Sequence, residues 1–71
     1  MDSQNKMVLE YLRKHKRGIN ARDAMIKLGV MRLSGRIHDL RDDGHAIETV
    51  ERVEKNRYGK KVRFAQYVLR S

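Results

Sequence analysis

The sequence of 71 residues contains no cysteine, no proline and no tryptophan. Without cysteine, disulfides and thiolate metal ligands are excluded, and the chain is suited to a reducing compartment. Uninterrupted apolar runs reach only three residues, whereas a membrane-spanning helix needs about 20. The first five residues are mostly polar and lack the apolar core of a signal peptide. We therefore expect a soluble, intracellular protein.

Acidic residues are scarce relative to basic ones. Nine Asp and Glu stand against 17 Lys and Arg, which gives a net charge of +8 and an isoelectric point near 10.3. The length indicates a single domain, residues 1–71, with no room for a second one. So large a charge on one small domain indicates a polyanionic partner, with nucleic acid ahead of an anionic membrane.

The charge is segregated along the chain. Residues 1–38 carry a net charge of +6, residues 39–54 a net charge of −4, and residues 55–71 a net charge of +6. A protein that is basic only for solubility more often intersperses the two signs. The pattern therefore indicates distinct basic surfaces, with chance clustering on a solvated surface as the alternative.

Apolar residues at helical spacing predict three helices, at residues 4–16, 21–28 and 32–43. Ser3 and Asn20 are suitable N-caps for the first two, and a glycine follows each of the three helices. The predicted inward positions are Ala24, Met25 and Leu28 in the second helix and Leu33, Ile37 and Leu40 in the third. Two short helices joined by a glycine-containing turn are typical of a helix-turn-helix.

The remainder of the chain predicts a β-hairpin over about residues 46–69. Residues 62–69 alternate between two faces, and the polar segment 55–61 contains Asn56 and Gly59, which suit a turn. The first strand, residues 46–53, is less regular. Its apolar residues Ile47, Val50 and Val53 recur every three positions, which fits a helix almost as well, or a strand with a bulge.

With these elements in place, four stretches of sequence carry a family resemblance: GINARDA at 18–24, LGV at 28–30, RIHDLR at 36–41 and NRYG at 56–59. Together with Gly44, they resemble the small winged helix-turn-helix proteins of phages and prophages, over almost the whole chain. The resemblance implies an α+β fold of three helices followed by a β-hairpin wing, with a short extra strand near Ile19. It also implies a DNA-binding regulator in a prokaryotic cytoplasm.

The third helix is the candidate recognition helix, whose N-terminal residues reach base edges in the major groove. With Leu33 facing the core, Gly35 and His38 lie on the far side of the helix, Arg32 and Ser34 flank them, and Arg36 and Arg41 lie nearer the core edge. The DNA-binding candidates in this helix are Arg32, Ser34, Gly35, Arg36 and His38. Arg32 and Arg36 are the leading candidates for bidentate contacts with guanine, each worth about 1–3 kcal/mol of discrimination. Gly35 allows either close approach of DNA or tight helix packing, and His38 either binds DNA or is an idle surface residue.

The hairpin turn is the second candidate DNA-binding surface. It places five cations within nine residues, and such a tip lies along a phosphate backbone or enters a minor groove. The wing candidates are Lys55, Asn56, Arg57, Tyr58, Lys60, Lys61 and Arg63. Turn geometry alone is an alternative explanation for Asn56, and protection of an exposed strand edge is one for the cations.

Catalysis is not expected, and neither is a metal or another cofactor. The three histidines have no second ligand at metal-binding spacing, and no serine lies in a nucleophile motif. The neighbouring Asp42 and Asp43 would point apart on a helix and cannot form a carboxylate dyad.

The leading hypothesis is sequence-specific binding of double-stranded DNA, by a transcription regulator or a recombination directionality factor. One copy offers little surface, so dimers or tandem sites are expected. The alternative is a protein-interaction module whose basic face binds and inhibits an acidic host protein. RNA binding is disfavoured because few aromatics are available for stacking, and membrane binding because no long amphipathic helix is predicted.

Overall fold

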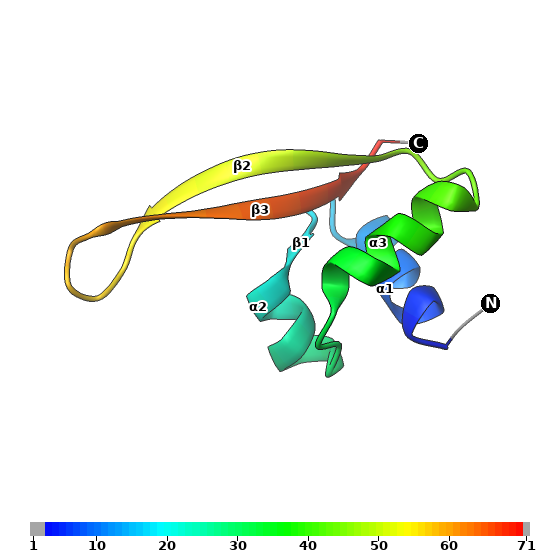
Figure 1. Ribbon diagram of the computed structural model, residues 1–71, viewed down its shortest axis with the longest axis horizontal. Helices are drawn as coiled ribbons and strands as arrows, with labels where there is room; N and C mark the ends of the chain where they lie inside the picture. The colour runs from blue at the N-terminus through cyan, green and yellow to red at the C-terminus, as the bar shows by residue number, and fades with distance from the viewer. Residues whose placement is uncertain (1–2, 71) are drawn as a thin grey trace.

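The computed structural model describes residues 3–70, which form a helical cluster and a three-stranded sheet (Figure 1). In chain order the elements are α1 (Ser3–Lys14), β1 (Ile19–Asn20), α2 (Ala21–Asp23), the π-helix η1 (Ala24–Leu28), α3 (Leu33–Asp42), β2 (Ile47–Lys55) and β3 (Lys61–Leu69). The sheet order is β1-β3-β2, and both pairings are antiparallel. The predicted α+β fold is confirmed, including the short strand at Ile19.

The first helix is shorter than the predicted range of 4–16. α1 ends at Lys14, and its last turn carries Arg13 and Lys14. Beyond it, the Gly18 N–H donates to the His15 carbonyl at 3.0 Å and closes a turn. His15, Lys16 and Arg17, which continue this basic segment, therefore lie in that turn and not on the helix.

The second predicted helix, 21–28, is a single α-turn followed by a π-helix. Asn20 caps it as expected, because its side chain accepts a hydrogen bond from the Asp23 N–H at 2.8 Å. Gly29 ends it in the left-handed conformation, with φ of 70°. Ala24 is buried, but the prediction of an inward Met25 is wrong, since 48% of that residue is exposed. A π-turn holds an extra residue, which shifts positions off the inward stripe of a regular helix.

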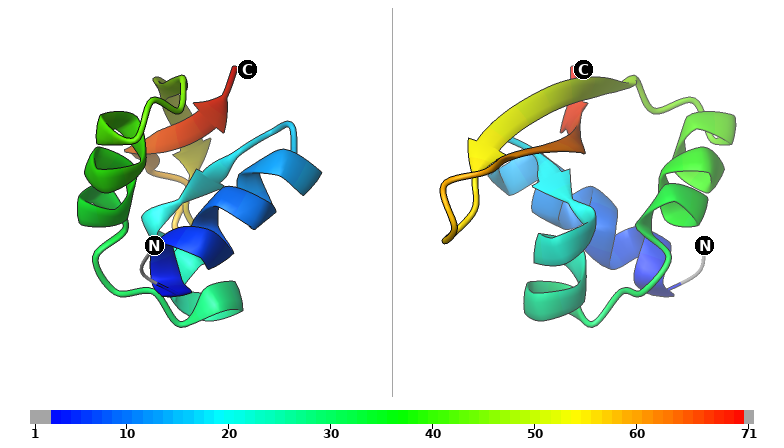
Figure 2. Two further views of the ribbon diagram at one scale, coloured as in Figure 1. Left: turned by 90° about the vertical axis from the view of Figure 1, so that its right-hand side faces the viewer. Right: turned by 60° about the vertical axis from the view of Figure 1, so that its left-hand side comes forward.

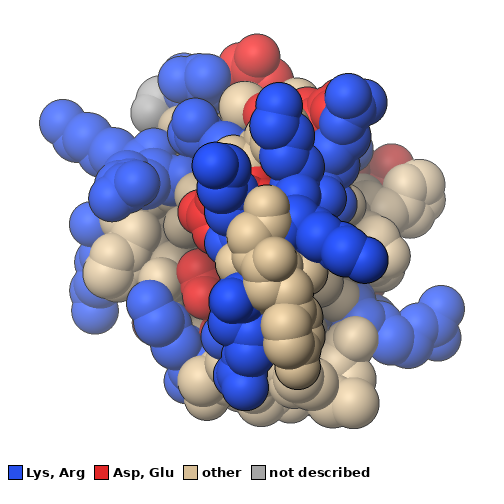
Figure 3. Space-filling view, turned by 90° about the vertical axis from the view of Figure 1, so that its left-hand side faces the viewer, with Lys and Arg blue, Asp and Glu red and all other residues tan. Residues whose placement is uncertain are grey.

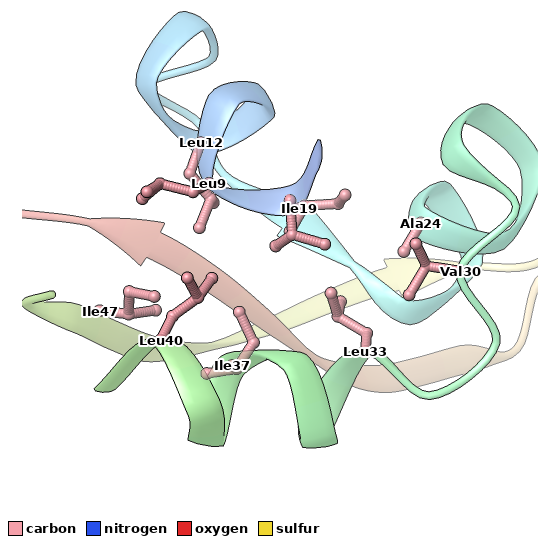
Figure 4. Packing of buried hydrophobic residues seen from close by; sticks show 10 residues of the cluster. Leu9, Leu12, Ile19, Ala24, Val30, Leu33, Ile37, Leu40 and Ile47 are labelled. Atoms are coloured by element: carbon pink, nitrogen blue, oxygen red, sulfur yellow. The ribbon is translucent and has the colours of Figure 1, made fainter. Parts of the chain in front are cut away.

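The core lies between the three helices and the root of the sheet. Figure 4 shows side chains from α1, β1 and α3 pointing toward one another. The predicted stripe of α3 is confirmed, because Leu33, Ile37 and Leu40 are all buried. α3 spans Leu33–Asp42 instead of 32–43, because Arg32 has the extended φ of −121° that places it at the N-cap position.

The hairpin is regular and extends well beyond the core. Its register runs without interruption from the Ile47–Leu69 pair to the Lys55–Lys61 pair, so both the helical and the bulged alternatives for the first strand are excluded. Only the root of the hairpin is buried, at Ile47 and Val68. The free half projects past the helices and accounts for the long axis of 40 Å (Figure 1). α2 lies between α3 and the hairpin tip (Figure 2).

Candidate nucleic-acid interface

A groove separates the helix-turn-helix from the free half of the hairpin. It has a volume of about 970 Å³, and its lining comes from the start of α2, the turn before α3, the first residues of α3 and both strands of the hairpin. Arg32 and Ser34 from the helical side face this groove together with Lys55 and Asn56 from the hairpin. The fold therefore brings together two pairs of candidates that lie more than 20 residues apart in sequence.

The start of α3 presents unsatisfied backbone donors at this groove. Arg32 is the N-cap residue, and its side chain makes no capping hydrogen bond. The first N–H groups of a helix have no partner within the helix and carry the positive end of its dipole. Arg32 and Ser34 are both exposed at this end. The combination favours an anionic ligand at the start of α3.

Arg36 lies on the opposite flank of α3, toward α1. Its Nη2 atom is 3.6 Å from Asp39 Oδ2, and 25% of the Arg36 side chain is exposed. The same Asp39 oxygen accepts a hydrogen bond from Asn5 Nδ2 of α1, at 3.3 Å. Arg36 does not line the groove, so it is separated from Arg32, with which the sequence had grouped it.

His38 lies on the exposed outer face of α3, next to an acid. Its Nε2 atom is 3.4 Å from Asp42 Oδ2, and both side chains are largely exposed. Asp39, Asp42 and the C-cap residue Asp43 outnumber Arg41 at this end of α3, so the end is acidic. A polyanion would therefore approach the first turn of α3 more favourably than its second half.

Gly35 has open space around it. A Cβ atom added there would have no heavy atom within 4 Å outside the helix's own backbone. Tight packing among residues 3–70 therefore does not explain the glycine. Close approach of DNA, the other predicted explanation, stays a prediction.

Replacing Gly35 with alanine should affect stability and DNA affinity in opposite directions. The free energy of unfolding should rise by about 1 kcal/mol, because alanine is the better helix former. Affinity for duplex DNA should fall, because the added methyl group would stand between the helix and the bases. Thermal melts and duplex titrations measure the two effects. A stabilised Gly35→Ala protein with unchanged affinity would remove this position from the interface.

The hairpin tip is held by one asparagine side chain. Asn56 Oδ1 accepts hydrogen bonds from the N–H groups of Tyr58, at 2.9 Å, and Lys60, at 3.1 Å. Gly59 completes the turn with φ of 77°. Asn56 thus stabilises the turn, which is one of the two explanations that the sequence predicted for it. Tyr58, in the same turn, has 80% of its surface exposed.

The wing cations lie around this tip and along the hairpin. Arg57, Lys60, Lys61 and Arg63 lie beyond the groove lining, and Arg63 Nη1 is 3.6 Å from Glu51 Oε1. Seen from the side of the tip, the surface is dominated by Lys and Arg, with Asp and Glu in small patches between them (Figure 3). The basic surface therefore continues outward from the groove to the end of the hairpin.

Arg41 is a positioning residue that the sequence did not single out. Its Nε donates to the Ile47 carbonyl at 2.9 Å, and its Nη2 donates to Thr49 Oγ1 at 2.8 Å. Its guanidinium carbon lies 6.0 Å from the centre of the Tyr67 ring. These contacts tie α3 to both strands and fix the angle between the helix and the hairpin. The sequence placed Arg41 near the core edge but gave no hairpin register with which to identify its partners.

The groove also contains apolar side chains that the sequence did not mark as functional. Met31 and Ile26 line it with 74% and 64% of their surfaces exposed, and Val62 is exposed on its hairpin side. The spacing of apolar residues in the sequence does not separate these exposed residues from core residues, because their exposure depends on where the hairpin lies. They add exposed apolar surface to the lining of the groove.

Residues 3–70 contain neither a metal-binding cluster nor a membrane-spanning helix. No group of three or more His, Asp or Glu side chains there could hold a metal ion. None of the helices in the same range has the length and apolarity needed to cross a bilayer. The absence of catalytic activity stays a prediction.

Comparison with known proteins identifies the family. A family model described as a winged helix-turn-helix domain matches residues 3–71. Comparisons with curated proteins and with solved structures gave no match. Winged helix-turn-helix domains are typically non-enzymatic DNA-binding modules, so the match suggests DNA as the partner. With this match over nearly its full length and with the fold described above, the chain belongs to the winged helix-turn-helix domain family.

Proposed function

We propose that this protein binds double-stranded DNA with sequence preference, using the start of α3 and the hairpin together. The observation that supports the proposal most strongly is the shared groove, where Arg32 and Ser34 face Lys55 and Asn56. One duplex reaching into this groove would touch a recognition helix and a basic hairpin at once. Base edges would supply specificity, and phosphates would supply most of the affinity.

The charge distribution on α3 sets the docking direction. The first turn offers Arg32 and uncapped N–H groups, whereas the second half carries Asp39, Asp42 and Asp43. The helix would therefore enter the major groove by its N-terminal end, with Arg32 as the leading reader of guanine. Arg36 would take part only if its ion pair with Asp39 opened.

The hairpin would contact the sugar-phosphate backbone and the neighbouring minor groove. Lys60 and Lys61 lie near the tip, and Tyr58 is held outward by the Asn56 turn. Such contacts neutralise phosphates without reading the sequence. In the cell, the resemblance to phage-type proteins favours a transcription regulator or a recombination directionality factor in a prokaryotic cytoplasm.

Two variants separate specific from non-specific contacts. Arg32→Ala should reduce the difference in affinity between the preferred duplex and a scrambled one, by about 1–3 kcal/mol for a lost bidentate contact. Lys60→Ala combined with Lys61→Ala should weaken binding to both duplexes equally. The preferred duplex is first obtained by selection from randomised sequences, and fluorescence anisotropy then gives the affinities. Identical effects of the two variants would show that the assigned roles are wrong.

The exposed apolar residues in the lining of the groove support a second candidate function, a protein-interaction module. A phosphate backbone gains little from Ile26, Met31 and Val62, whereas an acidic protein with an apolar anchor would bury them. A pulldown from nuclease-treated lysate, followed by pulldowns with Ile26→Ser and Lys60→Ala, tests it. A stoichiometric acidic partner that depends on both residues would favour this function over DNA binding.

A further inference from the structure

β2 is an edge strand whose outward backbone groups can be identified. In an antiparallel ladder, hydrogen-bonded pairs alternate with non-hydrogen-bonded pairs. The Arg70 N–H donates to the Ala46 carbonyl at 2.8 Å, and the Asn56 N–H donates to the Lys60 carbonyl at 2.9 Å. On the β2 side of the hairpin, the residues in these two bonds, Ala46 and Asn56, are both even-numbered. The even residues of β2 therefore bond to β3, and its odd residues direct their N–H and C=O groups outward.

Most of these outward groups are free for pairing. The Ile47 carbonyl accepts the hydrogen bond from Arg41. Within residues 3–70, no hydrogen-bond partner is found for the backbone groups of Thr49, Glu51, Val53 and Lys55 on this edge. A row of unpaired donors and acceptors is a template for another strand.

We propose that a second copy of this chain pairs with the β2 edge, antiparallel and with Val53 opposite Val53 of the partner subunit. The two sheets would join into one, with the order β1-β3-β2 continued by β2-β3-β1 of the second copy. A two-fold axis through the Val53 pair makes the contact self-complementary, as a closed dimer requires. This inference goes beyond DNA binding and does not rest on it.

Charge complementarity supports this register. With Val53 at the axis, Arg52 lies opposite Glu54 of the partner subunit, and Glu51 lies opposite Lys55 of the partner subunit. The two-fold axis repeats both pairs, so four opposite-charge pairs flank the central valines. Directly opposite residues on adjacent strands are close enough for such pairs to stabilise the sheet.

Neighbouring registers lack this complementarity. Centring the pairing on Glu51, Arg52 or Glu54 would place that charged residue opposite its own copy. Centring it on Val50 would require the Ile47 carbonyl, which Arg41 already occupies. Val53 also suits the central position, because this apolar residue is 52% exposed on an otherwise charged strand.

The arrangement gives the segregated charge of the sequence a structural role. In this register, residues 51–55 of the two β2 strands pair, so Glu51 and Glu54 of one subunit face Lys55 and Arg52 of the partner subunit.

Disulfide trapping reads the register directly, because the chain has no cysteine of its own. Opposite residues in a hydrogen-bonded antiparallel pair have Cα atoms about 5.5 Å apart, within the range of a disulfide. Under mild oxidation without DNA, Val53→Cys should give a covalent dimer faster than Thr49→Cys, Glu51→Cys or Val62→Cys. Equal rates at all four positions would overturn the proposal, as would fastest trapping at Glu51→Cys.

Charge exchange tests the same contact without a crosslink. Sedimentation velocity at high protein concentration should show that Arg52→Glu lowers the dimer fraction, because it places like charges across the axis. The double variant Arg52→Glu with Glu54→Arg should restore the fraction to that of the unaltered chain. Lys6→Glu, on the exposed surface of α1, serves as a control of equal charge change. A monomeric unaltered chain, or a double variant that is not restored, would refute the interface and leave the DNA-binding proposal to its own tests.

Discussion

Replacement of Gly18 by alanine is expected to abolish the native fold. Gly18 has φ of 86°, and an added Cβ would lie 2.0 Å from the Tyr67 carbonyl oxygen and 2.9 Å from Val68 Cγ2. The positive φ alone costs a non-glycine residue about 1–3 kcal/mol. The overlap with Tyr67 is with backbone, so it is relieved only by moving β1 away from β3. A domain of this length has a total stability of about 4–10 kcal/mol.

The matched control is Gly44→Ala. Gly44 also has a positive φ, of 94°, but an added Cβ there meets nothing within 4 Å. The substitution should therefore lower the free energy of unfolding only by the cost of the positive φ, and the variant should remain folded. Circular dichroism melts of the two variants measure the difference. If both melted at the same temperature, the close contact between Gly18 and β3 would not be a determinant of the fold.

The affinity for duplex DNA is expected to fall about 1,000-fold between 50 and 200 mM salt, if about six phosphates are neutralised. The cations available for this are the groove residues Arg22, Lys27, Arg32 and Lys55 and the tip residues Arg57, Lys60 and Lys61. The logarithm of the binding constant should decrease with the logarithm of salt at a slope near −5. Titrations with a labelled duplex at several salt concentrations give this slope.

The Lys60→Ala, Lys61→Ala double variant provides the internal check on that slope. Loss of two phosphate contacts should make the slope less steep by about 2. A variant such as Lys6→Ala, on the exposed surface of α1 and outside the groove lining, should leave it unchanged. A flat response of the unaltered protein to salt would contradict the electrostatic basis of the proposed function.

Local features of the fold were predictable from the sequence. The stripe of Leu33, Ile37 and Leu40 follows from helical periodicity alone, and the Asn20 cap and the Gly29 stop follow from local backbone chemistry. The turn at Asn56 and Gly59 was predictable for the same reason. Each of these depends on residues within a few positions of one another.

Features that depend on distant contacts were not predictable. The π-helix that exposes Met25, the bond from Asn5 to Asp39, and the bonds from Arg41 to the hairpin depend on how α1, α3 and β2 pack. The irregular apolar spacing of β2 also concealed a long, regular strand, because its free half buries nothing. Amphipathic patterning predicts a strand only where one face is covered.

The most direct test of the central claim is to map where α2 and the hairpin tip lie on one duplex. Ala21→Cys at the groove and Tyr58→Cys at the tip provide single attachment points for a DNA-cleaving iron chelate. With affinities of the labelled proteins matched to the unlabelled one, both chelates should cut the selected duplex, at positions within about one helical turn of each other. Cleavage from only one of the two positions, or cleavage spread evenly along the duplex from both, would contradict simultaneous binding by the helix-turn-helix and the hairpin.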